Sequence, residues 1–151
     1  MDMPVRVADD VDLGRLDSAL GFLLRMAQLK VYERFFETLG DKDLKPGEFS
    51  VLWVISRNPG IRQSVLGQRL MIKRAHMTKL IRGFEDRGLV TRRVPDEDRR
   101  AVEITLTPEA AARVEKAAEW FFDFEDAVGN NLSSAEQKQL TLLLRKIVGL
   151  N

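Results

Sequence analysis

The chain has 151 residues, 44% hydrophobic and 31% charged, with a formal net charge of +1, a composition typical of a single soluble globular domain. No stretch approaches the roughly 18 apolar residues of a membrane span, and no secretory signal pattern opens the chain, so we expect a cytoplasmic protein. The absence of cysteine excludes disulfides, thiolate metal sites and a cysteine redox switch.

The first third of the chain predicts two amphipathic helices. Apolar residues recur at three- and four-residue spacing from Leu13 to Phe35, which predicts one long helix that ends at Gly40. Pro46 suits the first turn of a second helix, because its missing N–H costs nothing there. The run Asn58-Pro59-Gly60 ends this second helix.

The middle third predicts two short helices and a β-hairpin. The apolar spacing places the helices at 62–69 and 73–87, with Gly88 as the C-cap of the second. The pattern then alternates, which predicts strands at 89–94 and 101–106 with a charged tip between them.

The last third predicts two more helices. Thr107-Pro108-Glu109 has the residues of a helix start, and the helix continues to Gly129. Ser133 and Glu136 form a capping box for the last helix. The order of elements predicts a mainly α fold with a small β-hairpin wing, that is, a winged helix-turn-helix with long N- and C-terminal helices.

The charge distribution favours DNA as the partner. Residues 62–100 hold 11 Lys or Arg against 5 Asp or Glu, whereas the rest of the chain is net acidic. A basic middle is typical of a module that contacts phosphate, although a solvated charged face gives the same count. A helix fits the major groove with its N-terminal side chains at base edges. The candidates for this role are Lys73, Arg74, His76, Thr78 and Lys79.

Other polar residues are candidates for the DNA backbone and the minor groove. Arg62, Gln63 and Ser64 begin the supporting helix and, with Arg82, could hold phosphates; Gln63 and Ser64 could equally be capping residues. At the hairpin tip, Asp98 could bind one Arg and stiffen the tip, so that another Arg projects into an A·T-rich minor groove. The tip candidates are Asp98, Arg99 and Arg100.

The run 98–107, Asp-Arg-Arg-Ala-Val-Glu-Ile-Thr-Leu-Thr, resembles the wing pattern D-x-R-x-x-x-v-x-L-T of the MarR (multiple antibiotic resistance regulator) family. Residues 77–90 resemble its recognition helix and the start of its wing, and the resemblance covers roughly 13–148. Two residues depart from the pattern. Lys73 stands where the family commonly has Asp or Ser, and Gly67 where it usually has Ala. The missing cysteine excludes the thiol-based, peroxide-sensing branch.

The resemblance implies a transcriptional regulator, usually a repressor, that pairs through its terminal helices. We therefore expect a single domain over 1–151, with dimerisation helices at 13–38 and 108–149 and a DNA-binding lobe at 44–107. The apolar stripes of the terminal helices agree, because a small winged helix cannot cover them alone. A symmetric homodimer would place two recognition helices about one DNA turn apart, on a pseudo-palindromic operator.

Family members often bind a small molecule between the dimer helices and the DNA-binding lobe, and this releases DNA. The resemblance thus implies an effector such as an aromatic carboxylate or an aryl-CoA thioester. Residues of these types are more often core than ligand contacts, and Arg25 could simply be solvent-exposed. The lining candidates are Phe22, Arg25, Met26, Trp53 and Phe121.

Two other classes of function compete with this interpretation. A helical interaction module would bind its partner without the steep salt dependence of phosphate contacts. An enzyme is disfavoured, because the single histidine, His76, lies among basic residues without a Ser, Asp or Cys partner. The sequence has no nucleotide-binding or histidine-rich metal motif, so we expect neither a cofactor nor a metal.

Overall fold

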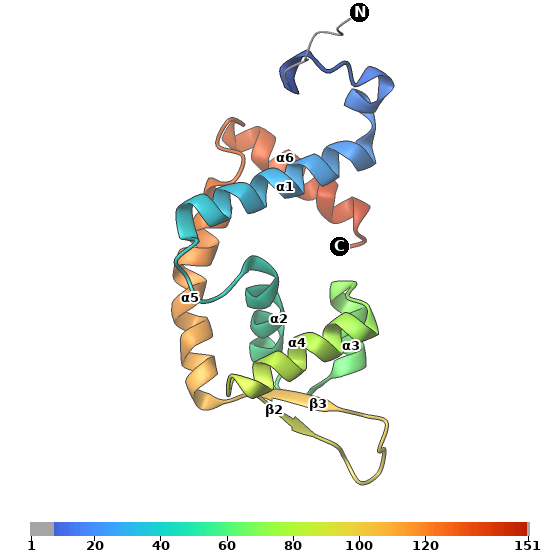
Figure 1. The fold of residues 1–151 in the computed structure, drawn as a ribbon, viewed down its shortest axis with the longest axis vertical. Helices are drawn as coiled ribbons and strands as arrows, with labels where there is room; N and C mark the ends of the chain where they lie inside the picture. The colour runs from blue at the N-terminus through green and yellow to red at the C-terminus, as the bar shows by residue number, and fades with distance from the viewer. Residues whose placement is uncertain (1–7, 151) are drawn as a thin grey trace, which may run out of the picture. The chain divides into compact units, whose positions relative to one another are not determined.

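The computed structural model describes residues 8–150 and divides into two compact units, residues 1–42 and residues 43–151. Residues 1–7 and 151 of the predicted domain lie outside the described residues. Helices dominate both units (Figure 1). The division falls between the predicted N-terminal dimerisation helix and the predicted DNA-binding lobe.

The first unit contains one long α-helix, α1 (Leu20–Leu39), preceded by the 3₁₀ helices η1 (Ala8–Asp10) and η2 (Gly14–Ser18). The prediction of one continuous helix from Leu13 is wrong, because Ala19 is extended between η2 and α1. Gly14 has a positive φ of 57°, and its N–H donates to Asp12 Oδ1 at 2.8 Å. Local side-chain bonds of this kind compete with a regular helix. The predicted end at Gly40 is confirmed.

The second unit holds the predicted winged helix-turn-helix and the two C-terminal helices. All predicted helices and both predicted strands are present in it, and their ends differ from the predictions by a few residues. Its elements are α2 (Pro46–Arg57), β1 (Ile61–Arg62), α3 (Gln63–Leu70), α4 (Arg74–Asp86), β2 (Val90–Arg93), β3 (Glu103–Leu106), α5 (Pro108–Ala127) and α6 (Ser134–Ile147).

A three-stranded antiparallel sheet in the order β1-β3-β2 forms the base of the wing. Val90 pairs with Leu106 and Arg93 with Glu103, so β2 and β3 make the predicted hairpin, which extends away from the helices (Figure 1). β1 was not predicted, because two residues are too few for an alternating pattern. Its pairing with β3 attaches the start of α3 to the wing.

One core holds the second unit together, and its side chains come from helices α2, α3, α4 and α5 and from strands β2 and β3. The amphipathic face of α4 contributes Met77, Ile81 and Phe84, each 1% exposed. This burial fixes which face of α4 meets the core and leaves the opposite face to solvent. The other largest buried side chains of this unit are Phe49, Val51, Leu52, Ile55, Leu66, Ile104 and Val114.

The helix starts predicted for α5 and α6 are confirmed. The Thr107 hydroxyl oxygen accepts from the Ala110 N–H at 3.2 Å. Ser133 and Glu136 exchange both bonds of a capping box. α6 nevertheless has no buried residue, and Leu140, Leu143 and Ile147 are exposed along it.

Candidate nucleic-acid interface

A tight turn sets α4 against α3. Met71 adopts the left-handed conformation, with φ of 55°, and the Ile72 N–H donates to the Gly67 carbonyl at 2.9 Å. A Cβ on the buried Gly67 would lie 3.1 Å from the Ile72 carbonyl oxygen. The close approach of the two chain segments therefore favours glycine at position 67, where this chain departs from the family pattern. The turn holds α3 and α4 together as a helix-turn-helix.

The exposed face of α4 carries most of the side chains that we predicted for the major groove. Lys73 is the N-cap residue and makes no side-chain cap bond. Thr78 is half-buried, whereas four other predicted residues, Lys73, Arg74, His76 and Lys79, are exposed, as is Arg82. Ala75, which the sequence argument did not single out, lies exposed among them. The first turn of α4 thus presents cations at a helix N-terminus, where an anion is favoured.

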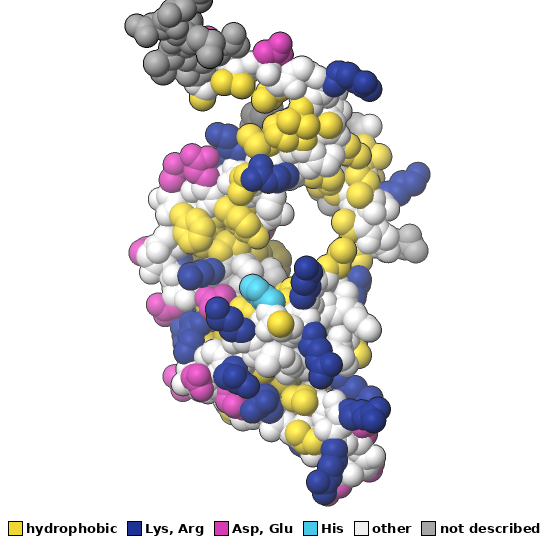
Figure 2. Space-filling model, turned by 45° about the vertical axis from the view of Figure 1, so that its right-hand side comes forward, with side chains coloured by type: hydrophobic (Ala, Val, Ile, Leu, Met, Phe, Trp, Pro, Cys, Tyr) yellow, Lys and Arg dark blue, Asp and Glu magenta, His cyan; other side chains and the backbone are white. Residues whose placement is uncertain are grey.

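Most of the Lys and Arg between residues 62 and 100 make no ion pair with another described residue. Of the 11 Lys and Arg between 62 and 100, Arg62, Arg87, Arg92 and Arg93 pair with a carboxylate. Figure 2 shows several dark blue Lys and Arg side chains on the surface around the cyan histidine. A surface of this kind attracts phosphate. The cations that make no ion pair with any residue of 8–150 are Arg69, Lys73, Arg74, Lys79, Arg82, Arg99 and Arg100.

Asp98 joins the wing tip both to itself and to β1. Its Oδ1 accepts from the Arg100 backbone N–H at 3.0 Å, and its Oδ2 lies 3.8 Å from Nη1 of Arg62. The prediction that an Arg of the tip binds Asp98 is therefore met by the backbone of Arg100, whereas the ion pair comes from Arg62 on the neighbouring strand. The side chains of both Arg99 and Arg100 are exposed, so the tip offers two cations to a partner.

Gln63 and Thr78, both predicted to contact DNA, hydrogen-bond to each other. Gln63 Nε2 donates to Thr78 Oγ1 at 3.2 Å, and Thr78 Oγ1 donates to the Arg74 carbonyl at 2.9 Å. The Gln63 backbone N–H donates to the Val102 carbonyl at 2.8 Å. Gln63 therefore links the start of α3 to both α4 and the wing, while the neighbouring Ser64 is exposed.

Two ion pairs missed by the sequence argument hold the wing. Arg92 on β2 binds Glu85 of α4 through both carboxylate oxygens, at 2.8 and 3.2 Å. The hydrogen bond from Arg92 lowers the pKa of Glu85 below its ordinary value of 4.5. Arg93 pairs across the hairpin with Glu103 at 3.3 Å. Periodicity carries no signal for such pairs, since they depend on which strand lies beside which helix.

The predicted effector residues are divided between the two units. Phe22, Arg25 and Met26 lie on α1, within residues 1–42. Phe121 is 8% exposed and stacks on Phe49 with ring centroids 4.1 Å apart, so it is a core residue of residues 43–151. Trp53 stacks on Phe49 at 5.9 Å, and the Arg57 guanidinium lies 5.8 Å from its ring.

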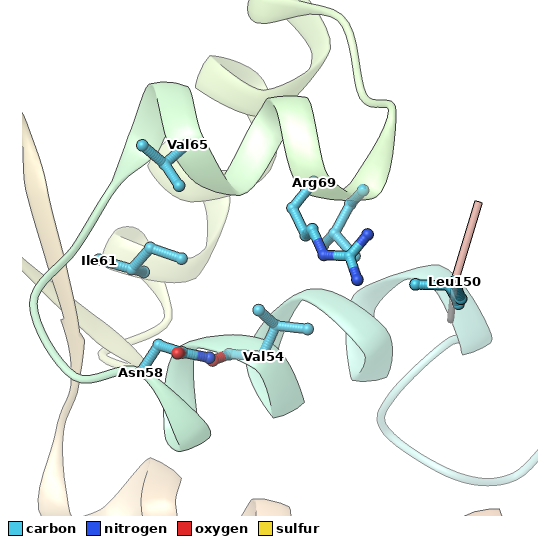
Figure 3. A pocket seen from close by; sticks show the side chains of 7 residues that line it. Val54, Asn58, Ile61, Val65, Arg69 and Leu150 are labelled. Carbon is cyan, nitrogen blue, oxygen red and sulfur yellow. The ribbon is translucent and has the colours of Figure 1, made fainter. Parts of the chain in front are cut away.

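An open pocket of about 520 Å³ lies between α2 and α3. In Figure 3 the Arg69 side chain reaches from α3 toward α2, and it is the only charged group of the lining. The Asn58 amide donates to the Val54 carbonyl at 2.8 Å and is engaged locally. None of the five predicted effector residues lines the pocket. Its walls are Val54, Asn58, Ile61, Val65, Arg69, Leu70 and Leu150.

Across 8–150 no group of His, Cys, Asp and Glu side chains could hold a metal ion. None of the helices in the same range combines the length and apolar character needed to cross a membrane.

Comparisons with known proteins agree with this geometry. The model of the MarR family matches residues 44–102. A putative transcriptional regulatory protein for the hcr operon of Thauera aromatica is 31% identical over 138 residues, covering 89% of this chain and 81% of that protein. The transcriptional repressor CouR bound to a 23-mer DNA duplex superposes with a TM-score of 0.82 at 30% identity, covering 92% of this chain and 99% of CouR. CouR bound to p-coumaroyl-CoA gives a TM-score of 0.80 at 28% identity, and the match covers 92% of this chain and 98% of CouR.

Proposed function

Because this chain belongs to the MarR family of transcriptional regulators, we propose that it binds a pseudo-palindromic DNA operator as a homodimer, represses transcription there, and is released by a small anionic effector. Its relatives are transcriptional regulators and not enzymes. The comparisons therefore exclude the enzyme interpretation.

The observation that carries the proposal is the set of exposed, unpaired cations on α4 and on the wing tip. α4 would lie in the major groove with Lys73, Arg74, His76 and Lys79 toward the bases. Arg99 and Arg100 would enter the adjacent minor groove from the tip. Phosphates beside these grooves would be held by Arg62, Ser64 and Arg82, which set the register of the protein on the duplex.

A second copy of the chain would cover the apolar residues that the terminal helices leave exposed. On α6, Leu140, Leu143 and Ile147 are 44%, 50% and 53% exposed and share one face at three- and four-residue spacing. α1 likewise exposes apolar residues along its length, including Leu20 at 60% and Leu23 at 44%. A symmetric dimer through 13–38 and 108–149 would bury both sets and present two copies of α4 to one duplex.

The pocket beside Arg69 supports an effector that has an apolar body and a negative end. Four aliphatic residues and Leu150 would contact the body, while the exposed Arg69 would bind a carboxylate or phosphate. The relative CouR has been captured with p-coumaroyl-CoA, which favours an aromatic acid or its CoA thioester here. A ligand that moved α3 would also move α4 through the Gly67–Ile72 turn, and DNA affinity would then fall by the linkage between the two sites.

A DNA-binding titration tests the central proposal. A duplex enriched by the wild-type chain from a randomised pool should bind more tightly than random DNA. Affinity for both should fall by about three orders of magnitude between 50 and 200 mM salt, because phosphate contacts release counterions. Lys138→Ala, which removes an exposed cation from α6, is the matched control and should leave both affinities unchanged. No enrichment and a flat salt response would contradict DNA binding.

A thermal-shift series tests the effector. Aromatic carboxylates and their CoA esters should raise the melting temperature of the wild-type chain and release the enriched duplex. Arg69→Gln should abolish the shift, whereas Arg82→Gln, a cation outside the pocket, should retain it. An equal shift in both variants would place the ligand elsewhere.

A further inference from the structure

The hydroxyl of Thr78 is already used within the protein, although Thr78 lies among the residues proposed to face the major groove. Its single hydrogen is donated to the Arg74 carbonyl oxygen at 2.9 Å. Its oxygen accepts from Nε2 of Gln63 at 3.2 Å. Gln63 is itself held in place, because its backbone N–H donates to the Val102 carbonyl at 2.8 Å.

These bonds limit what Thr78 can recognise. A hydroxyl has one hydrogen, so Thr78 cannot donate to a phosphate oxygen, to guanine N7 or O6, or to thymine O4 while the bond to Arg74 stands. One lone pair and the γ-methyl group remain. The methyl takes part in neither hydrogen bond of this half-buried side chain, and its apolar counterpart in the major groove is the C5-methyl of thymine.

We propose that Thr78 is a specificity-determining residue that recognises a thymine by contact between its γ-methyl and the C5-methyl of the base. Gln63 and the Arg74 carbonyl hold the hydroxyl, and thereby fix the rotamer that presents the methyl. Gln63 is a positioning residue in this arrangement and not a phosphate contact. The inference rests on the proposed function, since it requires α4 to lie in the major groove.

Uracil provides the direct probe, because it differs from thymine only by the missing C5-methyl. Each thymine of the enriched duplex is replaced by deoxyuridine in turn, and binding is measured for the wild-type chain, Thr78→Val and Thr78→Ser. Valine keeps the methyl and lacks the hydroxyl, whereas serine does the reverse. For the wild-type chain, one position in each half-site should lose about fourfold in affinity, the effect of one buried methylene-sized group.

The two Thr78 variants should separate the effect of the methyl group on DNA affinity from the effect of the hydroxyl. Thr78→Val should show the same uracil penalty at the same position, because the two γ-methyl groups of valine hold one preferred rotamer in a helix without any hydrogen bond. Thr78→Ser should bind the thymine duplex about fourfold more weakly and show no further loss with uracil. Gln63→Ala should reduce the uracil penalty while it leaves affinity for random DNA unchanged, since only the rotamer of Thr78 is released. Equal melting temperatures across the set would exclude loss of folding as the cause.

Several results would overturn the inference. One is the absence of a uracil penalty for the wild-type chain. Another is a uracil penalty that persists in Thr78→Ser, since another residue such as Ala75 would then contact the thymine methyl. The third is a loss of binding in Thr78→Val that Thr78→Ser does not share. Failure to enrich any duplex would overturn the proposed function, and this inference with it. Enrichment without a thymine penalty would overturn the inference alone.

Discussion

Single cations in the DNA-binding lobe differ in whether a carboxylate already neutralises them. Arg87 binds Glu48 at 2.9 Å and Arg92 binds Glu85 at 2.8 Å, and each pair joins two elements of the fold. Arg99 and Arg100 are exposed and make no ion pair within residues 8–150. Substitutions of Arg87 and Arg92 should thus act on structure, and substitutions of Arg99 and Arg100 on DNA affinity.

Arg100→Ala should weaken operator binding without lowering the melting temperature. The side chain is exposed, and the backbone N–H that donates to Asp98 at 3.0 Å is retained in alanine. A gel-shift titration with the enriched duplex measures the effect. Arg93→Ala, on the stem of the same hairpin, is the control and should change affinity less. Unchanged affinity in Arg100→Ala would count against a role for the wing.

Lys79→Ala should cost about 1–3 kcal/mol of binding free energy on the enriched duplex if Lys79 reads a base. Its exposure on the face of α4 opposite the buried Met77, Ile81 and Phe84 places it toward solvent. Fluorescence anisotropy on enriched and random duplexes separates two roles. Selective loss on the enriched duplex indicates base readout. An equal loss on both would assign Lys79 to a phosphate instead.

Among the elements, α6 depends more on its caps than the others, because none of its residues is buried in this chain. Its start is closed by two reciprocal bonds: Ser133 N–H to Glu136 Oε1 at 2.9 Å and Glu136 N–H to Ser133 Oγ at 3.1 Å. A short helix that buries little apolar surface is marginal in water. Changes at its cap should therefore be visible in stability.

Ser133→Ala should destabilise the helix by about 1 kcal/mol, the usual cost of losing an N-cap side chain. Denaturant unfolding followed by circular dichroism measures the change. Ser134→Ala removes the adjacent hydroxyl, which lies inside the helix and makes no cap bond among the described contacts. It should therefore be nearly neutral. Equal effects of both variants would argue against the cap.

Glu136 makes α6 sensitive to acid. The backbone hydrogen bond from Ser133, supported by its hydroxyl, lowers the pKa of Glu136 below its ordinary value of 4.5. The stabilisation is therefore fully present above about pH 4.5 and is lost as pH falls through the lower folded-state pKa. Glu136→Gln keeps a capping amide but does not titrate, so its melting temperature should fall less between pH 6 and pH 3. Identical acid profiles would contradict this role.

At the scale of the whole molecule, the exposed apolar face of α6 predicts self-association. Leu143→Glu should convert the dimer to a monomer, because it places a charge on the face shared with Leu140 and Ile147. Leu142→Glu is the matched control, since Leu142 lies on the opposite face of α6 and is 67% exposed. It should remain dimeric. Sedimentation equilibrium distinguishes the states, and a monomeric wild-type chain would refute the dimer proposal.

The order and type of the main elements follow from the sequence alone, because their signals are local. Apolar spacing predicted α4, and the turn residues after Arg57 predicted the end of α2. The cap residues Thr107 and Ser133 predicted the starts of α5 and α6. Local spacing failed where a local bond competed with the helix, as at Gly14 and Ala19, and where β1 was too short to show a period.

Only the tertiary structure decided which of the 11 cations of residues 62–100 stay unpaired. It also brought Asp98 to Arg62, and Gln63 to Thr78 across 15 residues. Such contacts join elements that are distant along the chain, so their partners depend on how helices and strands pack. The pocket beside Arg69 has the same origin, because its walls come from α2, α3 and residue Leu150. The residue composition of a segment does not predict these contacts, because they form only when the core fixes the positions of the helices and strands.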